Sequence, residues 1–394
     1  MNLKYTNIAL VHDWYLKKSI GGAEKVTLII DELLSNNYSV PDLFSLTENV
    51  SQKNKSLFGD RKINTSFIQK LPFGRNKIQK YLPIIPFAIE QMDLRRYDVI
   101  ISSSHIAAKG VLTSPDQLHI SYIHTPMRYA WDQMNTYIDK SSLKKYGFEL
   151  PLRYLLFKLR EWDFISGQRP DYLIANSYFT SRRIKKYWGL NSEVIHPPIN
   201  IQRFKCNLPR ENFYLSVCRL VPNKRVDLII KAFNKLGLPL ILVGEGPEKS
   251  NLKKLASPNI QFYGNDTNSN VEKLMSTCRA FIYAGVEDFG IAPVEAIASG
   301  APVIALAKGG LLDTVNCLTN CSKNKIATGI LFKVQNVSNI IDTVNWFEDK
   351  KIWKKFNPEL QNKFAQKFSE DKFKIKFGKF INKSWGNFQK SKFY

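Results

Sequence analysis

The stretch RAFIYAGVEDFGIAPVEAIASGAPVIAL, residues 279–306, decides the fold that we expect for this chain. Its apolar run at 281–283 predicts a strand, and Pro293 near the start of a short run of small residues predicts a helix before the next strand. Two carboxylates, Glu287 and Glu295, fall just after the first strand and in the first turn of the helix. In an open parallel α/β sheet, ligands bind at this carboxyl edge of the strands.

Apolar runs of strand length alternate with helical patterns along most of the chain. We expect strands at residues 7–11, 40–46, 97–101, 119–124, 172–175, 192–196, 213–217, 240–243, 260–263, 280–283 and 303–305. This alternation predicts an α/β fold with parallel sheets and helices on both faces of each sheet. Residues 51–94 are mixed and poor in helical pattern, so we assign them no structure.

The chain of 394 residues is long enough for two domains of ordinary size. Pro197 and Pro198 break regular structure between the two halves, so we place the boundary there. The expected domains are residues 1–200 and residues 201–374, with their strand ends facing a common cleft. We expect the final helix, about residues 375–394, to pack back on the first domain.

Composition favours a globular protein over a disordered one, because 44% of the residues are hydrophobic. No apolar run approaches the roughly 20 residues that span a bilayer, and we find no signal peptide, so we expect a cytoplasmic protein. The odd number of cysteines, five, favours reduced thiols. A zinc site at Cys317 and Cys321 is less favoured than ordinary thiols, because no second pair and no nearby histidine accompanies them.

The formal net charge is +23, and residues 350–394 alone hold 13 lysines and 3 acidic residues. Phe and Trp recur among these lysines. Such helices could lie on an anionic membrane surface, or they could pack their aromatic rings on the core and expose the lysines to water. Nucleic acid is a weaker candidate partner, because no binding motif accompanies the charge.

Three loops of the second half suit a bound anion. Arg219 and Lys224 lie in the loop after the strand at 213–217, next to a helix N-terminus, where N–H groups and the helix dipole favour phosphate. The alternative for any one lysine of this chain is a position facing solvent. Glycines that would leave room for a ligand mark the other two loops, at Gly244, Gly246, Gly309 and Gly310.

The first half offers two further sites for ligand contact. Gly21 and Gly22 stand between a strand and a helix, where the backbone could approach a ligand closely or simply make a tight turn. The strand at 119–124 ends in His124, and Arg128 follows it, so polar chemistry lies at this sheet edge. A structural histidine held by the backbone is the alternative for His124.

Glu287 and Glu295 have several possible interpretations. Singly, each fits an ordinary acid, in a solvated loop or in a first helical turn. Together with the basic loop, they fit acceptors of hydrogen bonds from the vicinal hydroxyls of a sugar or a ribose. We find no Asp-x-Asp motif to hold a metal ion on a sugar-nucleotide diphosphate, so the phosphate charge would fall to Arg219 and Lys224.

These motifs resemble the retaining glycosyltransferases of family 4, which have the GT-B architecture of two Rossmann-like domains. The resemblance covers most of the chain and rests on a combination of motifs: Gly21-Gly22, RLVPNKRVDLII from Arg219, VGEGP from Val243, the E-x7-E pair Glu287 and Glu295, and Gly309-Gly310. The phrase YIHTPMRYAWD, residues 122–132, resembles the subgroup of bacterial O-antigen and surface-polysaccharide mannosyltransferases. Asp313 departs from the family, which often has Glu after the glycine pair.

The resemblance implies a role for each matched residue. Arg219 and Lys224 would stabilise the donor diphosphate as it leaves, Glu287 would hold hydroxyls of the donor sugar, and His124 would contact that sugar. Glu295 would hold the ribose. The other substrate-binding positions would be Gly21, Gly22, Arg128, Gly244, Gly246, Phe289, Gly290, Ile291, Gly309 and Gly310. The resemblance implies no metal and no cofactor, with the nucleotide sugar as a substrate.

We therefore expect a retaining, metal-independent hexosyltransferase that moves mannose from GDP-mannose to a lipid-linked or polysaccharide acceptor in surface-glycan biosynthesis, at the cytoplasmic face of the inner membrane. A UDP- or dTDP-sugar donor is the first alternative. A glycoside hydrolase that uses Glu287 and Glu295 as an acid pair is a second, although the basic loop has no role in it. A non-catalytic basic protein that binds membrane or nucleic acid is the remote alternative.

Overall fold

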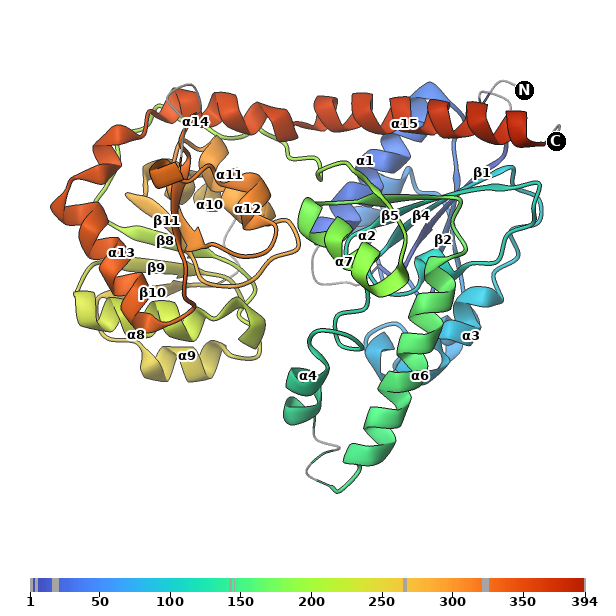
Figure 1. The fold of residues 1–394 in the computed structure, drawn as a ribbon, viewed down its shortest axis with the longest axis horizontal. Helices are drawn as coiled ribbons and strands as arrows, with labels where there is room; N and C mark the ends of the chain where they lie inside the picture. Colours follow the sequence, from blue (N-terminus) through green and yellow to red (C-terminus); the bar gives the residue numbers. More distant parts are fainter. Residues whose placement is uncertain are drawn as a thin grey trace. The chain divides into compact units, whose positions relative to one another are not determined.

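The computed structural model describes residues 3, 6–15, 21–141, 144, 146–264, 268–320 and 326–392 (Figure 1). The chain divides into two compact units. Unit 1 is Met1–His196 with Phe373–Tyr394, and unit 2 is Pro197–Lys372. Both units have the predicted α/β architecture, with a parallel sheet and helices on both faces.

Unit 1 is built on a seven-stranded parallel sheet in the order β3-β2-β1-β4-β5-β6-β7. The strands are β1 Ile8–His12, β2 Asp42–Ser45, β3 Ile63–Thr65, β4 Val99–Ser104, β5 Leu118–Ile123, β6 Tyr172–Ala175 and β7 Glu193–Val194. From β1 the chain winds outward to β3, returns to the other side of β1, and continues outward to β7. The order therefore reverses between β1 and β4.

The helices of unit 1 cover both faces of this sheet (Figure 1). They are α1 Gly22–Asn37, α2 Gln52–Lys55, α3 Ile85–Glu90, α4 Met134–Lys140, α6 Glu149–Gly167, α7 Tyr178–Trp188 and most of α15 Glu370–Ser391, with short 3-10 helices η2 Ser56–Phe58, η3 Phe67–Lys70, η4 Ile78–Ile84 and η5 Ala108–Gly110. Neighbouring residues of a strand point to opposite faces. Leu10 of β1 accordingly packs in the core with α1 and α15, and Val11 packs in the core with α3, α4 and α6.

Unit 2 repeats this plan with six parallel strands in the order β10-β9-β8-β11-β12-β13. Its strands are β8 Tyr214–Val217, β9 Leu240–Val243, β10 Ile260–Tyr263, β11 Ala280–Tyr283, β12 Val303–Leu306 and β13 Gly329–Phe332. Its helices are α8 Val226–Leu236, α9 Lys249–Leu255, α10 Asn268–Thr277, α11 Ile291–Ala298, α12 Leu311–Thr314, α13 Val337–Asp349 and α14 Pro358–Ala365, with 3-10 helices η6 Pro222–Lys224, η7 Leu318–Asn320, η8 Ile352–Lys355 and η9 Gln366–Phe368. Here the order reverses between β8 and β11.

The aromatic rings of α15 pack inward. Phe373, Phe377 and Trp385 are buried against the strands of unit 1, and the hydroxyl of Tyr38, the C-cap of α1, donates a hydrogen bond of 3.2 Å to the carbonyl of Gly378. The packing alternative is therefore confirmed for this helix, and its aromatic rings are not available to enter a membrane. In the described part of the chain, no helix combines the length and the apolar character needed to cross a bilayer.

Two strands were not predicted. β3 lies in the mixed segment 51–94 and is only three residues long and half-buried, so it has no apolar run to reveal it. β13 follows β12, which we had taken as the last strand of the second half, and it begins at Gly329. The backbone of Val303 lies where a side chain at Gly329 would stand, which requires glycine there.

Candidate active site

Several of the predicted site residues lie in loops that follow the strands at which the sheet order reverses. In unit 2 these loops follow β8 and β11, and in unit 1 they follow β1 and β4. At such a switch point neighbouring loops turn to opposite faces of the sheet, which leaves space for a ligand at the carboxyl edge. The loop after β8 contains Arg219 and Lys224, and the loop after β11 contains Glu287.

Lys224 and Glu287 form an ion pair across the switch point of unit 2. The hydroxyl of Tyr283, the last residue of β11, donates a hydrogen bond to the same carboxylate. Both members of the pair are partly exposed, with relative accessibilities of 19% for Lys224 and 18% for Glu287. Burial, and next the charge of Glu287, raise the pKa of Tyr283 well above its ordinary value, so this hydroxyl stays a donor at neutral pH.

Arg219 lies in the same loop with its side chain exposed. In the part of the chain that the structure describes, its guanidinium has no hydrogen bond and no ion pair, so the charge is available to an incoming anion. The loop ends at Arg225, which has a positive φ of 52° at the N-cap of α8 and pairs with Asp227 at 3.0 Å. The turn is costly for a residue other than glycine, and such turns gather at functional sites.

The glycines of the anion loops hold neighbouring backbones close together. At Gly244 a side chain would meet the carbonyl of Cys218, and at Gly246 it would meet the carbonyl of Leu220. The amide of Leu220 donates to the carbonyl of Glu245 at 2.9 Å, which joins the loop after β9 to the loop after β8. Backbone therefore stands where a side chain would be at these two positions, which requires glycine at both.

Gly309 and Gly310 act in the same way on the loop after β11. A side chain at either position would overlap the backbone of residues 287–289. The amide of Gly310 donates to the carbonyl of Glu287 at 2.8 Å, and Glu287 forms a β-bridge with Gly309. The glycine pair thus fixes the backbone that carries the Glu287 carboxylate.

Phe289, Gly290 and Ile291 form the entry to α11. Phe289 is buried, and Gly290 has a φ of 95°, which favours glycine at this N-cap. A side chain on Gly290 would also meet Leu311 at 2.8 Å. Because the first amides of a helix have no partner inside the helix, this turn presents N–H groups at the carboxyl edge of β11.

Glu295 lies further along α11 and has a partner of its own. Its carboxylate accepts a hydrogen bond of 3.2 Å from Arg203, whose guanidinium also lies 3.3 Å from Glu272 of α10. Sequence reasoning missed Arg203, because it stands in irregular chain shortly after the boundary at Pro197 and Pro198. The two carboxylates of the E-x7-E pair therefore each interact with a different cation, Glu287 with Lys224 and Glu295 with Arg203.

Three histidines meet at the switch point of unit 1. His12 ends β1, His105 follows β4 and His124 follows β5, and these three strands are neighbours in the sheet. The ring centroid of His12 lies 5.8 Å from that of His105 and 6.4 Å from that of His124. The Ser103 hydroxyl contacts Nε2 of His124 at 2.8 Å. Sequence reasoning singled out only His124.

Asp13 fixes the loop that carries His105. Its buried carboxylate accepts hydrogen bonds from four successive backbone amides, those of residues 105–108, at 2.6 to 3.1 Å. The carboxylate also pairs with Nδ1 of His105 at 2.7 Å. Burial opposes the charge on both groups, but their mutual attraction outweighs it, so the pKa of Asp13 is lowered and the pKa of His105 is raised.

The other two histidines are neutral. Burial lowers the pKa of His12, and burial followed by the nearby His12 and His105 lowers the pKa of His124 well below its ordinary value. Nδ1 of His12 lies 2.9 Å from the carbonyl of Ser103, which can only accept, so this nitrogen carries the proton. Nε2 of His12 is then a buried acceptor, and no described residue donates to it.

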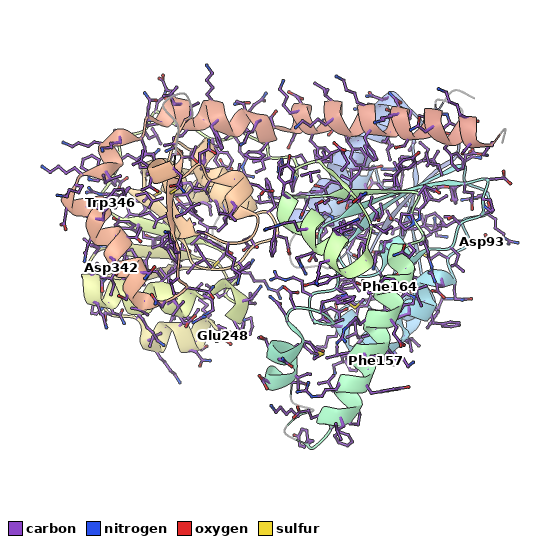
Figure 2. The ribbon with its side chains drawn as sticks, viewed as in Figure 1. Asp93, Phe157, Phe164, Glu248, Asp342 and Trp346 are labelled. Carbon is purple, nitrogen blue, oxygen red and sulfur yellow. The ribbon has the colours of Figure 1, made fainter. Side chains whose placement is uncertain are left out.

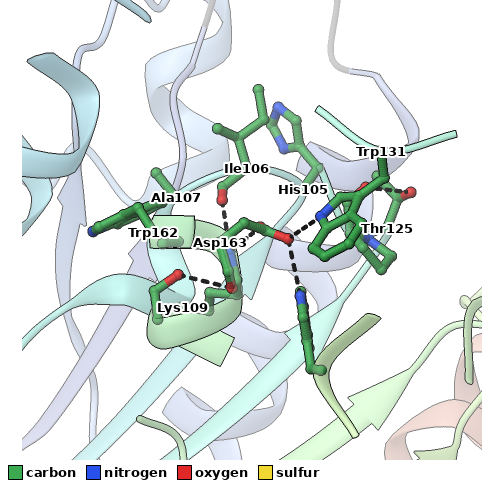
Figure 3. A network of polar contacts seen from close by, with 12 residues as sticks. His105, Ile106, Ala107, Lys109, Thr125, Trp131, Trp162 and Asp163 are labelled. Carbon is green, nitrogen blue, oxygen red and sulfur yellow. Dashed lines mark hydrogen bonds and ion pairs between the residues drawn. The ribbon is translucent and has the colours of Figure 1, made fainter. Parts of the chain in front are cut away.

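A second buried carboxylate, Asp163 of α6, holds the far end of the same loop (Figure 3). It accepts hydrogen bonds from Lys109 at 2.7 Å, from the indole of Trp131 at 2.8 Å and from the indole of Trp188 at 2.9 Å. Lys109 also donates to the carbonyl of Ile106 at 2.9 Å. The loop after β4 is therefore tied at both ends, which positions His105 between β1 and β5.

Gly21 and Arg128 also lie near the carboxyl edge of unit 1. Gly21 is the N-cap of α1, which begins at Gly22, and a side chain there would meet the carboxylate of Glu24 in the first turn. Arg128 lies 3.7 Å from Asp132, which also accepts a hydrogen bond of 3.1 Å from Arg183.

Two cysteines of unit 2 lie next to strands, Cys218 after β8 and Cys278 before β11. Burial raises the pKa of Cys218 to about 12, and burial raises that of Cys278 to about 12, so both are protonated thiols at neutral pH. No three described His, Cys, Asp or Glu side chains are grouped so as to hold a metal ion. Cys321 lies outside the described residues, so the structure does not test it as a partner of Cys317.

Both halves of the chain match sequence models of glycosyltransferases. The model described as Glycosyltransferase Family 4 matches residues 20–203, and the model described as Glycosyl transferases group 1 matches residues 199–370. HepE of Anabaena, solved in complex with UDP, has a similar structure with a TM-score of 0.65, at 16% identity over 96% of this chain and 100% of HepE. This likeness supports the GT-B fold.

Two relatives are named as mannosyltransferases. A GDP-mannose-dependent monoacylated alpha-(1-6)-phosphatidylinositol monomannoside mannosyltransferase of Corynebacterium glutamicum is 29% identical over 39% of this chain and 49% of the relative. The O-antigen chain mannosyltransferase RfbU of Salmonella typhimurium is 26% identical over 36% of this chain and 43% of the relative. The chain thus spans about half the length of these relatives. From the two family models and the fold together, the chain belongs to the family 4 glycosyltransferases of GT-B architecture.

Proposed function

We propose that the protein is a retaining, metal-independent mannosyltransferase that takes its sugar from GDP-mannose. The observation that carries this proposal is the arrangement at the switch point of unit 2, where the available cation of Arg219 stands in one loop with Lys224, and Lys224 pairs with Glu287. Two cations suit a diphosphate, and a neighbouring carboxylate suits the hydroxyls of the attached sugar.

In the proposed reaction, Arg219 and Lys224 stabilise the negative charge that develops on the nucleoside diphosphate as it leaves. Lys224 reaches the phosphate while it remains next to Glu287, and the Glu287 carboxylate accepts hydrogen bonds from donor hydroxyls. The acceptor hydroxyl attacks on the face from which the diphosphate departs, which retains the configuration of the sugar. Glu295 holds the ribose, and His124 contacts the donor sugar as a neutral imidazole.

The names of the two relatives support mannose as the sugar, and the name of the Corynebacterium relative specifies GDP-mannose. We further propose a lipid-linked or polysaccharide acceptor in surface-glycan biosynthesis, with the protein in the cytoplasm or at the cytoplasmic face of the inner membrane. In support, one relative is named for a phosphatidylinositol monomannoside and the other for the O-antigen chain.

A screen of sugar nucleotides that measures the release of free nucleotide tests this proposal. We expect release from GDP-mannose that rises when a lipid-linked saccharide is added. Arg219→Ala and Lys224→Ala should each abolish most of the release, whereas Lys231→Ala, an exposed lysine of α8, serves as the control and should leave it unchanged. Near-normal release in both site variants would contradict the assignment.

A UDP-sugar is the second candidate donor, because the structural neighbour HepE was solved with UDP. Thermal unfolding in the presence of GDP, UDP or dTDP discriminates between the donors, since a bound nucleotide raises the apparent stability. A shift with GDP alone supports GDP-mannose, and a shift with UDP alone favours the second candidate.

A further inference from the structure

Helix α6 carries an apolar stripe on its exposed side, which we call the outer stripe. It consists of Leu150, Tyr154, Phe157, Phe164 and Ile165, with exposed fractions of 78, 62, 44, 46 and 55%. Leu150, Tyr154, Phe157 and Phe164 are spaced four, three and seven residues apart, so they share one face of the helix, and Ile165 extends this face next to Phe164. Figure 2 labels Phe157 and Phe164 along this helix. Just before α6, Tyr146 and Phe148 are also exposed, at 76 and 55%.

The opposite face of α6 already supplies the contacts that the fold needs. Leu152, Leu156 and Leu159 are buried in the core beneath the sheet of unit 1. A helix on the surface of a globular protein normally turns charged and polar residues toward water on its other face. The outer stripe is therefore not part of this core, and an exposed apolar surface of this kind marks an interaction site.

The stripe has the length and the residue types of an interfacial surface. From Leu150 to Ile165 it extends about 22 Å at 1.5 Å per residue. Cations flank it: Lys158 lies 5.7 Å from the ring centre of Tyr154 and 5.3 Å from that of Phe157, and Arg153 is on the same helix. Aromatic rings beside Lys and Arg are typical of helices that lie in the headgroup region of a bilayer.

We propose that the outer stripe of α6 docks the protein on an anionic phospholipid bilayer. The formal net charge of +23 attracts an anionic surface and opposes a second copy of the same chain on the stripe. The stripe runs along the outer side of one helix, so it is a ridge that suits a flat surface. Glu161 is the one acid on this face, between Phe157 and Phe164, and Lys158 compensates it through a hydrogen bond of 2.9 Å.

This assignment differs from the membrane surface that we considered as one of two alternatives for the C-terminal helices. α15 packs on the other face of the same sheet, and its exposed side carries lysines such as Lys376, Lys379 and Lys383. Its only exposed large hydrophobic residue in the described range is Ile375, at 51%. The α15 surface can attract lipid headgroups but has little apolar area to enter the bilayer. The docking inference rests on the proposed function in one respect: docking on a bilayer would give the enzyme access to a lipid-linked acceptor.

Co-sedimentation with vesicles tests the proposal. The full-length protein should bind vesicles of phosphatidylcholine with phosphatidylglycerol, and bind vesicles of phosphatidylcholine alone more weakly. The double variant Phe157→Ser/Phe164→Ser should lower partitioning into the anionic vesicles by about ten- to a hundredfold, because two phenyl groups that would enter the bilayer are lost. Ile375→Ser on α15 is the matched control and should bind as the wild type does.

Two further variants sharpen the result. Glu161→Gln removes the acid from the stripe and should strengthen binding to anionic vesicles. Lys376→Gln/Lys379→Gln/Lys383→Gln should weaken binding much less than the phenyl double variant does. If the lysine variant loses binding while the phenyl variant keeps it, the docking surface is α15 and the proposal is wrong. If the phenyl variant instead abolishes a dimer seen by sedimentation and the wild type binds no vesicle, the stripe is a contact between copies.

The thermal shift with GDP is measured on each variant as an independent readout. An unchanged shift together with lost vesicle binding supports the docking surface and excludes a folding defect. A wild type that binds vesicles through the stripe but responds to no nucleotide would contradict the proposed function and leave the docking surface standing.

Discussion

The two switch points share one topology and differ in their chemistry. In both units the first and fourth strands are neighbours, and the loops that follow them meet at the carboxyl edge. In unit 1 these loops bring together buried groups, with His12 and Asp13 fully covered. In unit 2 they bring together Lys224 and Glu287, which remain partly exposed beside the open guanidinium of Arg219. The strand order thus determines which loops meet at the carboxyl edge. The residues that follow the strands determine whether the groups there are buried, as in unit 1, or partly exposed, as in unit 2.

The largest effect is expected where unit 1 is most rigid. Asp13→Asn keeps the shape of the side chain but replaces one acceptor oxygen by an amide donor that faces backbone N–H groups, and it removes the charge that His105 needs. We expect a loss of about 3–5 kcal/mol in the free energy of unfolding, as for other broken buried ion pairs. Denaturant unfolding measures it, and a loss below about 1 kcal/mol would show that the loop does not depend on this carboxylate.

Substitutions at the switch point of unit 2 should lower the rate of sugar transfer and leave the stability of the fold nearly unchanged. Lys224→Ala should lower kcat of sugar transfer by about a hundred- to a thousandfold, because a cation that stabilises the leaving diphosphate is lost. Arg219→Ala should act similarly. Melting temperatures should change little, since Arg219 is exposed and Lys224 is partly exposed. If either variant had a much lower melting temperature but a normal kcat, the cation would contribute to stability and not to sugar transfer, and the contrast with unit 1 would be wrong.

A smaller effect is expected from the carboxylate of the same pair. Glu287→Gln keeps an acceptor oxygen for Tyr283 but loses the charge, and we expect kcat/KM to fall by about ten- to a hundredfold, or about 1.5–3 kcal/mol for a charged hydrogen bond. Tyr283→Phe serves as the comparison, and its kcat/KM should fall by the equivalent of about 1 kcal/mol, because it loses one hydrogen bond to Glu287. Equal losses in the two variants would mean that Glu287 acts through its tyrosine neighbour and not through donor hydroxyls.

The smallest effect is a pH dependence in unit 1. The folded protein raises the pKa of His105, so the stability that its charge contributes is complete below about 6.5, the unfolded value, and is lost as pH rises through the folded value. His105→Asn should therefore lower the melting temperature more at about pH 6 than at about pH 9. An equal loss at both values would mean that His105 contributes by packing alone.

Much of the fold could be predicted because its signals are local. Buried parallel strands such as β4 and β11 are continuous apolar runs, and the residues after them are read directly from the chain. The matched family motifs singled out Lys224 and Glu287, and the structure brings these two side chains together although they lie 63 positions apart. The glycines could also be identified from the sequence, because they stand directly after predicted strands. Their role in holding two backbones together depends on a long-range contact, as between Gly310 and the backbone of residues 287–289, which no local pattern reveals.

The contacts that could not be predicted join residues with no distinctive local pattern. His12 and Asp13 end a first strand like many others, and only the neighbouring position of β4 brings His105 to them. Arg203 lies in an irregular segment, and only the folded chain brings its guanidinium next to the carboxylate of Glu295. Aromatic residues among lysines at the C-terminus suggested a membrane helix, yet burial is decided by what packs opposite, and for Phe377 that is the sheet.

The carboxylate of Asp163 has a spectroscopic consequence. It is bonded to the indoles of Trp131 and Trp188 at once, and it lies on α6, two residues from the end of the outer stripe. A displacement of α6 relative to Trp131 or Trp188 would lengthen one of these hydrogen bonds and change the polarity around that indole ring. Tryptophan emission should therefore report, without an added label, whether α6 shifts when the protein meets vesicles.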